Sequence, residues 1–250
     1  MYNRVKTSTE IANMRKSGRM LATVLQHLRN QIKAGMTTKD LGQMAAVELR
    51  KLGGQPAFLG YQGFPDVLCV SVNDEVVHGI PGSRVLKDGD IVGLDFGVIY
   101  NGMITDGAIS VIVGNTSDQR LKTLIDTTER SLNAGIASLK NGTKTGDIGA
   151  AIQAVLDKEK LGIVRDLVGH GVGHDLHEDP NIPNYGRAGT GVELKAGMTI
   201  AIEPMATLGA DDVYVDKDQW TIKTRDGSMA AHFEHTILVT NDGAEVLTKV

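Results

Sequence analysis

The sequence predicts an α+β fold in which helices cover one face of a curved antiparallel sheet. Three observations predict it: a long helical stripe near the N-terminus, a β-hairpin centred on Asn101-Gly102, and two pairs of matching segments separated by about 107 residues. Matches in the same order indicate a duplicated unit of two helices followed by β-hairpins. We therefore predict a single domain over residues 1–250, with halves at 8–113 and 117–250.

The first helix is predicted by apolar residues that recur at steps of three and four. These residues are Ile11, Met14, Gly18, Leu21, Leu25, Leu28 and Ile32. Thr7 and Glu10 have the spacing of a capping box, which predicts where this helix begins. A second helix is expected to begin near Thr37 and to end at Gly53-Gly54.

A β-hairpin is predicted after the second helix. Residues 91–100 and 103–113 are rich in strand-forming side chains, and Asn101-Gly102 between them is a strong signal for a two-residue turn. A turn of this length fixes the register of the two strands, because each residue then has a defined partner.

This register makes Asp95 and Asp106 the most informative pair in the chain. It places Gly97 opposite Asp106, and residues two apart on a strand share a face, so Asp95 lies diagonal to Asp106 at roughly 7–8 Å. Two such carboxylates either share a cation or force one of them to hold a proton. Two solvent-facing aspartates on a hairpin are the alternative.

The repeat extends this argument to a glutamate. The matching segments are 33–42 with 140–149, and 86–95 with 194–203. Under a duplication Asp95 corresponds to Glu203, so each half contributes one carboxylate from the equivalent strand, near a pseudo-twofold axis. Chance similarity of helix caps and Lys-Gly turns is the alternative explanation of the matches.

Two further candidates come from the second half. Glu234 lies in the predicted strand 229–239, and alternation makes it face away from Phe233 and His235. His170 is flanked by glycines, which we expect to leave its imidazole accessible and its backbone free for unusual dihedral angles.

Composition excludes several classes of protein. Apolar residues make up 41% of the chain and charged residues 22%, and the net charge of -4 with no basic stripe argues against binding to DNA or to a membrane surface. No apolar run is long enough to span a bilayer, and the N-terminus lacks a secretory signal. Cys69 is the only cysteine, so no intrachain disulfide forms. We expect a cytoplasmic protein.

Taken together, the motifs resemble those of the type I methionine aminopeptidases over almost the whole chain. Five segments in the same order carry the resemblance: 76–81 (VVHGIP), 94–106 (LDFGVIYNGMITD), 169–173 (GHGVG), 202–205 (IEPM) and 233–236 (FEHT). The fold of that family, the pita-bread fold, is a duplicated α+β unit, in agreement with the repeat. The short interval between His170 and Glu203, without the insertion of type II enzymes, and the lack of a cysteine-rich N-terminal extension imply the short bacterial form.

The resemblance implies a site for two divalent metal ions held by five residues. These are Asp95, Asp106, His170, Glu203 and Glu234. Oxygen-rich donors with one imidazole suit cobalt, manganese, iron or zinc, so the residues do not select the metal. By the same comparison His78, His177 and Glu203 are catalytic: His78 contacts the scissile amide, His177 stabilises the substrate carbonyl, and Glu203 shuttles protons. His27, His174, His232 and His235 are expected to be structural.

The resemblance also implies a methionine pocket. Its predicted walls are Tyr61, Phe64, Cys69, Leu176 and Trp220, with His78 and His177 at its edge. Phe64 and Leu176 depart from the family pattern, in which we expect a tyrosine and a larger aromatic residue. Packing in an ordinary core is the alternative for these apolar residues.

The function implied is removal of the N-terminal methionine from nascent polypeptides whose second residue is small. The bulky Tyr2 then predicts that this protein keeps its own Met1. A transient contact with the ribosome and a monomeric state are expected. Two alternatives remain: a proline-directed metallopeptidase with the same ligands, which would usually carry an additional N-terminal domain, and a homologue that binds protein or RNA without catalysis.

Overall fold

The computed structural model describes residues 4–249, so the prediction about Met1 and Tyr2 lies outside the described residues. The four long helices are α1 (Ser8–Gln31), α2 (Thr38–Leu52), α3 (Gln119–Ala137) and α4 (Thr145–Lys158), and a short 3-10 turn, η1, spans Tyr61–Gly63. The strands of the first half are β1 (Gln55–Pro56), β2 (Cys69–Val72), β3 (Glu75–Val77), β4 (Ile91–Tyr100) and β5 (Met103–Ile112).

The second half contributes ten strands of two to six residues. They are β6 (Gly162–Ile163), β7 (Gly169–Gly171), β8 (Glu178–Ile182), β9 (Thr199–Ile202), β10 (Met205–Thr207), β11 (Val213–Val215), β12 (Ile222–Thr224), β13 (Ala230–His232), β14 (Glu234–Val239) and β15 (Ala244–Val246). The largest sheet has the order β1-β4-β5-β14-β9-β7-β8, with β2 also paired to β4 and β15 to β14. Two three-stranded sheets, β13-β10-β6 and β11-β12-β3, complete the fold.

The predicted starts of the first two helices are confirmed. Thr7 caps α1 in a capping box with Glu10, as predicted, and Thr37 caps α2 through Asp40 in the same way. Gly53 ends α2 with φ of 81°, a left-handed conformation that glycine adopts without steric cost. Both helices therefore begin and end where local sequence stabilises their unpaired backbone groups.

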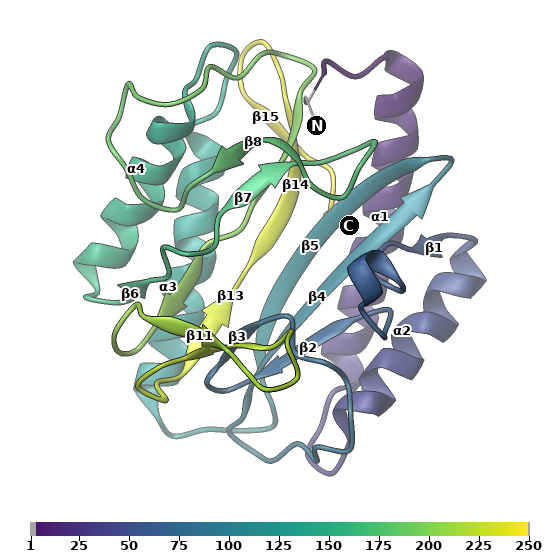
Figure 1. Ribbon diagram of the computed structural model, residues 1–250, viewed down its shortest axis with the longest axis vertical. Helices are drawn as coiled ribbons and strands as arrows, with labels where there is room; N and C mark the ends of the chain where they lie inside the picture. Colours follow the sequence, from purple (N-terminus) through teal and green to yellow (C-terminus); the bar gives the residue numbers. More distant parts are fainter. Residues whose placement is uncertain (1–3, 250) are drawn as a thin grey trace.

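The predicted hairpin register is also confirmed. Gly97 pairs with Asp106, and Asn101 and Gly102 both have positive φ, as a two-residue turn of the primed type requires. The return strand ends at Ile112, one residue earlier than expected. With ten residues in each strand, β4 and β5 form the longest ladder in the protein and cross the centre of the large sheet (Figure 1).

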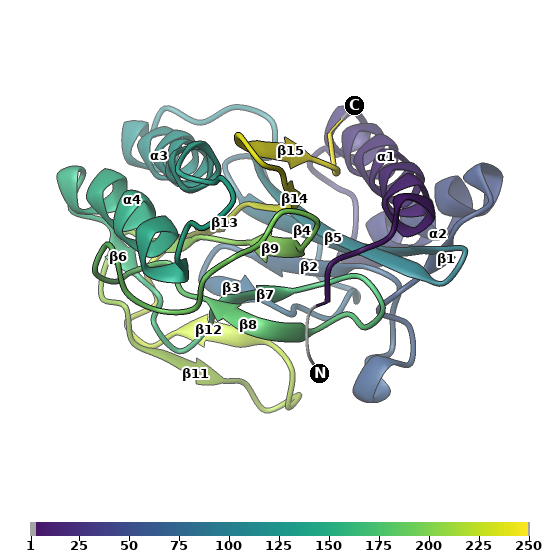
Figure 2. The same cartoon turned by 90° about the horizontal axis from the view of Figure 1, so that it is seen from above.

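The helices cover one face of the large sheet, as the α+β prediction requires. Figure 2 shows α1 and α2 on one side of the molecule and α3 and α4 on the other, both above the sheet, while β11 and β12 lie below it. Two apolar cores fill the space between helices and sheet. One joins α1 and α2 to β2 and β4, and the other joins α3 and α4 to β9 and β14. The opposite face of the sheet is therefore not covered by these helices.

The two halves share an order of elements but differ in strand length. Isolated bridges pair Thr37 with Val85 in the first half and Lys144 with Glu193 in the second, at equivalent places before α2 and α4. In contrast, Asp95 lies within the ten-residue β4, whereas Glu203 follows directly after the four-residue β9. The duplication itself stays a prediction.

Among the described residues, no helix has the length and apolarity to cross a bilayer.

Candidate active site

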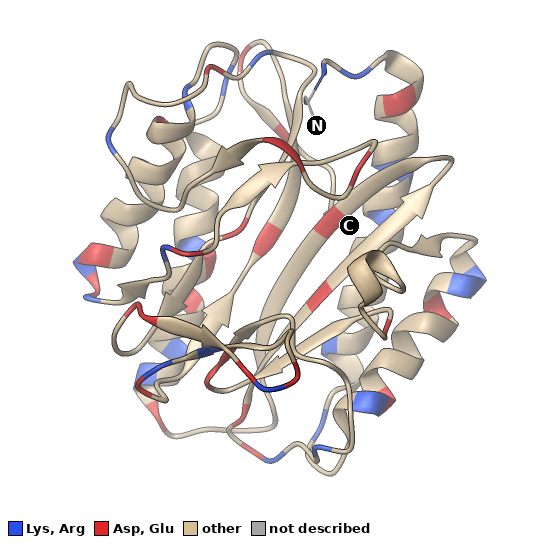
Figure 3. Cartoon of the chain, in the orientation of Figure 1, with Lys and Arg blue, Asp and Glu red and all other residues tan. Residues whose placement is uncertain are grey.

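The five predicted metal ligands converge below the centre of the large sheet. Asp106, His170 and Glu234 have ligand atoms that all lie within 4.8 Å of one another. The Nε2 atom of His170 lies 3.4 Å from Oε1 of Glu203. Figure 3 shows acidic residues on the central strands β4 and β5, which carry no Lys or Arg. The strands thus bring together residues that are far apart in the sequence.

Strand register explains how the carboxylates meet. Ala108 of β5 pairs with Asp95 on one side and with Glu234 on the other, so these three residues form one row across the sheet. Asp106 lies two residues from Ala108 and therefore on the same face. Glu203 joins them because His235, next to Glu234, pairs with the last residue of β9. Four carboxylates consequently meet on one side of four neighbouring strands, β4, β5, β14 and β9.

Burial of these carboxylates raises their pKa values. Burial and the neighbouring carboxylates hold the pKa of Asp95, Glu203 and Glu234 well above the usual range, and burial raises the pKa of Asp106 to about 7. Within the described part of the chain, Oδ1 of Asp95 and Oε1 of Glu234 are buried without a hydrogen-bond partner. Buried oxygens of this kind are costly unless a cation or a proton satisfies them. The donor atoms therefore fit a divalent metal.

His170 differs from the sequence-based expectation. It lies in β7 and is buried, with 7% of its surface exposed, and neither Gly169 nor Gly171 has a left-handed φ. The glycine serves close approach instead, because a Cβ at Gly169 would lie 2.4 Å from the carbonyl oxygen of Ala201. The predictions of an accessible ring and of unusual dihedral angles are therefore wrong.

The orientation of the His170 ring suits a metal ligand. Its Nδ1 atom lies 2.8 Å from the carbonyl oxygen of Gly171, which accepts a hydrogen bond from the Nδ1–H tautomer. That tautomer leaves the Nε2 lone pair directed at the carboxylates. Burial lowers the pKa of His170 to about 3, so the ring is neutral near pH 7.

Thr236, which sequence reasoning missed, exchanges hydrogen bonds of 2.8 Å with the backbone of Asp106 and holds that strand in place.

A cavity of about 190 Å³ opens directly beside the carboxylates. All twelve predicted site residues line it: Tyr61, Phe64, Cys69, His78, Asp95, Asp106, His170, Leu176, His177, Glu203, Trp220 and Glu234. Six more lining residues were not predicted: Phe58, Gln62, Val77, Leu167, Val168 and Met205. Four of the six lie inside or directly beside one of the sequence motifs: Val77, Leu167, Val168 and Met205. Their closeness in sequence to a predicted site residue could have indicated them.

The far wall of the cavity is apolar. Phe64 lies edge-on to Trp220, with ring centroids 5.1 Å apart, and edge-on to Phe58 at 6.5 Å. Cys69 and Leu176 are buried in the same cluster. The lining of the cavity therefore combines apolar side chains with carboxylates and imidazoles.

Two further histidines, His78 and His177, line the cavity. Burial lowers the pKa of His78 to about 4, and its backbone has φ of 61°, a strained conformation for a side chain other than glycine. The Nδ1 atom of His177 lies 2.8 Å from the hydroxyl of Tyr61, and its ring centroid lies 4.3 Å from that of His170. Burial also lowers the pKa of His177, so both rings are neutral near pH 7 and can donate or accept a hydrogen bond.

The other histidines lie at or outside the edge of the site. His232 is buried, and its Nε2 atom lies 3.9 Å from Glu203 and 4.0 Å from Glu234 without a hydrogen-bond partner among the described residues. His235 contacts the hydroxyl of Thr248 at 2.8 Å on the helix side of the sheet. His174 is not among the residues that line the cavity.

Buried carboxylates and a neutral imidazole beside an apolar cavity define the site of a metal-dependent hydrolase. The chain belongs to metallopeptidase family M24, whose model matches residues 12–241. Within this family it is similar to methionine aminopeptidases. It is 49% identical to methionine aminopeptidase 1 of Bacillus subtilis, over 98% of both chains, and 44% identical to the methionine aminopeptidase of Clostridium perfringens, again over 98% of both.

Solved structures show the same relation. The crystal structure of methionine aminopeptidase from Thermotoga maritima matches with a TM-score of 0.97 and 48% identity, over 99% of both chains. The Rickettsia prowazekii enzyme matches with a TM-score of 0.95 and 41% identity, over 98% of this chain and 99% of that one. These matches confirm the pita-bread fold. A prolidase from Pyrococcus furiosus shares the fold at 22% identity, with a TM-score of 0.78.

Proposed function

We propose that this protein removes the N-terminal methionine from polypeptides whose second residue is small. One observation carries the proposal: an apolar cavity closed by Phe64 and Trp220 adjoins a cluster of four buried carboxylates and one imidazole. An unbranched, polarisable side chain such as that of methionine suits the apolar end, and a free amino group suits the carboxylate end. The close relatives named above support the same reaction.

The proposed cofactor is a pair of divalent ions. Asp95, Asp106, His170, Glu203 and Glu234 would hold them, and the two unpaired buried oxygens described above support this assignment. Cobalt, manganese, iron and zinc all suit such donors. When bound, ions of this kind lower the pKa of a coordinated water and so supply a nucleophile near neutral pH.

The remaining roles follow from the neutral state of the histidines. His177, fixed by Tyr61, is placed to donate a hydrogen bond to the carbonyl oxygen of the scissile bond as negative charge develops there. His78, which also lines the cavity, would contact the scissile amide. Glu203 would accept a proton from the nucleophile and deliver it to the leaving amine.

The substrates would be the N-termini of nascent chains in the cytoplasm, and transient docking at the ribosome would bring enzyme and substrate together. The specificity for a small second residue predicts that the bulky Tyr2 protects the protein from its own activity. Intact mass of the untagged protein checks this. Loss of one methionine residue would contradict it.

Release of amino acids from two tripeptides tests the proposed function. Chelated enzyme reloaded with manganese or cobalt should release methionine from Met-Ala-Ser and leave Ala-Pro-Ser intact. Activity confined to Ala-Pro-Ser would instead indicate a proline-directed peptidase. Inactivity on both peptides, with metal bound, would favour a binding homologue.

A further inference from the structure

The loop of residues 173–178 carries two residues that line the cavity, Leu176 and His177. The proposed reaction does not involve the contacts that hold this loop in place. His177 is more exposed than its neighbours Leu176 and Glu178, which are each only 4% exposed. The hydrogen bond to Tyr61 holds one edge of its ring, and the buried neighbours hold the backbone that carries it. Leu176 packs in the apolar cluster with Phe64 and Cys69.

Glu178 holds the loop from the other side. Its Oε1 atom accepts hydrogen bonds from the backbone N–H of His174 at 2.7 Å and of Asp175 at 3.3 Å. The same residue begins β8 and pairs with Gly171 of β7. The carboxylate therefore joins the end of the loop to its beginning, next to β7, the strand that carries His170.

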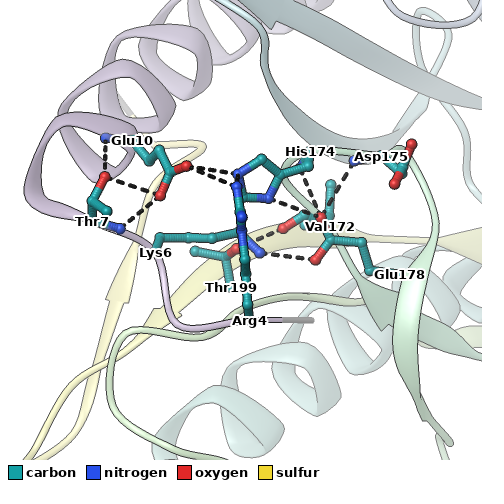
Figure 4. Close-up of polar contacts among 9 residues, drawn as sticks. All are labelled: Arg4, Lys6, Thr7, Glu10, Val172, His174, Asp175, Glu178 and Thr199. Carbon is teal, nitrogen blue, oxygen red and sulfur yellow. Dashed lines mark hydrogen bonds and ion pairs between the residues drawn. The ribbon is translucent and has the colours of Figure 1, made fainter. Parts of the chain in front are cut away.

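Lys6 completes the arrangement from the N-terminal segment. Its Nζ atom donates to Oε2 of Glu178 at 2.8 Å, and the two side chains are 0% and 2% exposed. The backbone N–H of Lys6 donates to the carbonyl oxygen of Gly197 at 2.8 Å. The lysine stem crosses the loop at Gly173, where a Cβ would lie 2.5 Å from Cε of Lys6. Figure 4 shows Lys6 reaching Glu178.

A second contact ties the loop to the first helix. The Nε2 atom of His174 lies 2.7 Å from Oε1 of Glu10, whose other oxygen accepts a hydrogen bond from the backbone N–H of Thr7 at 2.7 Å (Figure 4). The cap of α1 and the loop are thus joined. This contact is more exposed than the one between Lys6 and Glu178, so we expect it to contribute less.

We propose that the buried pair of Lys6 and Glu178 positions His177 for catalysis. The inference rests on the proposed function, since it assigns the pair a role in that reaction. A buried ion pair is weak evidence of a gain in stability, because desolvation offsets the attraction between the charges. Its effect here is on geometry: without Lys6, the buried carboxylate of Glu178 loses its lysine partner, and we expect the loop that it closes to rearrange. Both members act through His177 and are positioning residues.

Non-additivity tests the proposal. Lys6→Met and His177→Ala are made singly and together, and kcat and KM are measured on Met-Ala-Ser with metal-loaded enzyme. Misplacement of a reacting group by about 1 Å costs about 100-fold in rate, so we expect Lys6→Met to lower kcat by about that factor and to leave KM within about 3-fold. In the His177→Ala background, Lys6→Met should change kcat by no more than about 2-fold. Losses that multiply would overturn the proposal.

Two further variants control this comparison. Lys51→Met removes the same charge from an exposed pair with Glu48 and should leave kcat unchanged. Glu178→Gln keeps an oxygen for the backbone N–H groups of the loop but removes the charge, and it should lower kcat by an intermediate factor. If Lys6→Met does not fold, Glu178→Gln takes its place in the cycle.

An NMR measurement of the His177 ring does not depend on catalytic activity, so it tests the positioning role separately from the proposed function. In protein labelled at histidine, the His177 ring signal is identified by its loss in His177→Ala. Lys6→Met should shift or broaden that signal and leave the signal of the remote His27 unchanged. An unmoved His177 signal would overturn the positioning role even if methionine release is confirmed. An inactive wild-type protein would refute the reaction, while the ring signal would still decide whether the pair holds the ring.

Discussion

Cys69 lies directly opposite Asp95 in the antiparallel pair of β2 and β4. Side chains that face each other across such a pair lie on the same face of the sheet, about 4.5–5.5 Å apart at Cβ. The pairing of β2 with β4 therefore sets how the apolar part of the cavity lies relative to the carboxylate cluster. A shift of β2 by one residue would turn Cys69 to the other face of the sheet and separate the two parts of the site.

This relationship predicts that the thiol of Cys69 is unreactive in the folded protein. Burial, followed by the nearby charge of Asp95, holds the pKa of the thiol well above its usual range, and the thiolate is the reactive form. Iodoacetamide near pH 8 should leave the native protein unmodified and label one site after unfolding. Cys69→Ala should show no label in either state. Rapid labelling of the native protein would contradict the buried position.

Asp106 should destabilise the metal-free protein at high pH. Burial raises its pKa from 3.8 to about 7, so the folded state keeps a proton that the unfolded chain releases. The contribution to stability is fully present below about pH 4 and is lost as the pH rises through about 7. Asp106→Asn lacks this titration. Relative to chelated wild type, chelated Asp106→Asn should therefore gain stability between about pH 5 and pH 8.

Denaturant unfolding of both proteins at the two pH values measures this difference. The comparison between variants is needed because buried neutral histidines such as His170 and His78 change stability in the opposite direction over part of the range. Excess divalent metal should reverse the order, since it stabilises only a protein that binds it. A difference between the variants that does not change with pH would contradict the buried state of Asp106.

His177→Ala should lower kcat without removing metal. The ring lies beside the cluster and hydrogen-bonds to Tyr61, and loss of one such donor typically lowers the rate by about 100-fold or more. Metal content, measured by atomic absorption, should stay at the wild-type value. His27→Ala, far from the cavity, should have wild-type kcat and is the matched control. Equal losses in both variants would point to a general effect on folding.

Gly169→Ala should weaken the strand that carries His170. A Cβ there would lie 2.4 Å from the carbonyl oxygen of Ala201, which is backbone and cannot move away cheaply. Overpacking of this kind costs about 1–3 kcal/mol in the free energy of unfolding. Gly243→Ala has no atom within 4 Å of the added Cβ and should stay within about 0.5 kcal/mol of wild type. Equal midpoints of urea unfolding for the two variants would argue against the close approach.

Local parts of the fold followed from the sequence because their causes are local. The caps at Thr7 and Thr37 depend on residues three positions away, and the register of Asp95 and Asp106 depends on a two-residue turn. The wrong expectation for His170 has an equally clear origin. A glycine can serve either a left-handed φ or a close approach, and the sequence of a single strand does not distinguish these.

The sequence by itself determined the first two helices and the central hairpin, because their causes are local, and its ordered motifs indicated twelve of the eighteen residues that line the cavity. Only the tertiary structure decided how these parts meet: Glu234 beside Ala108, Thr236 against the backbone of Asp106, and Lys6 buried against Glu178. Each of these contacts joins residues more than 100 positions apart. Their formation depends on the packing of whole strands and loops, which no local pattern of side chains encodes.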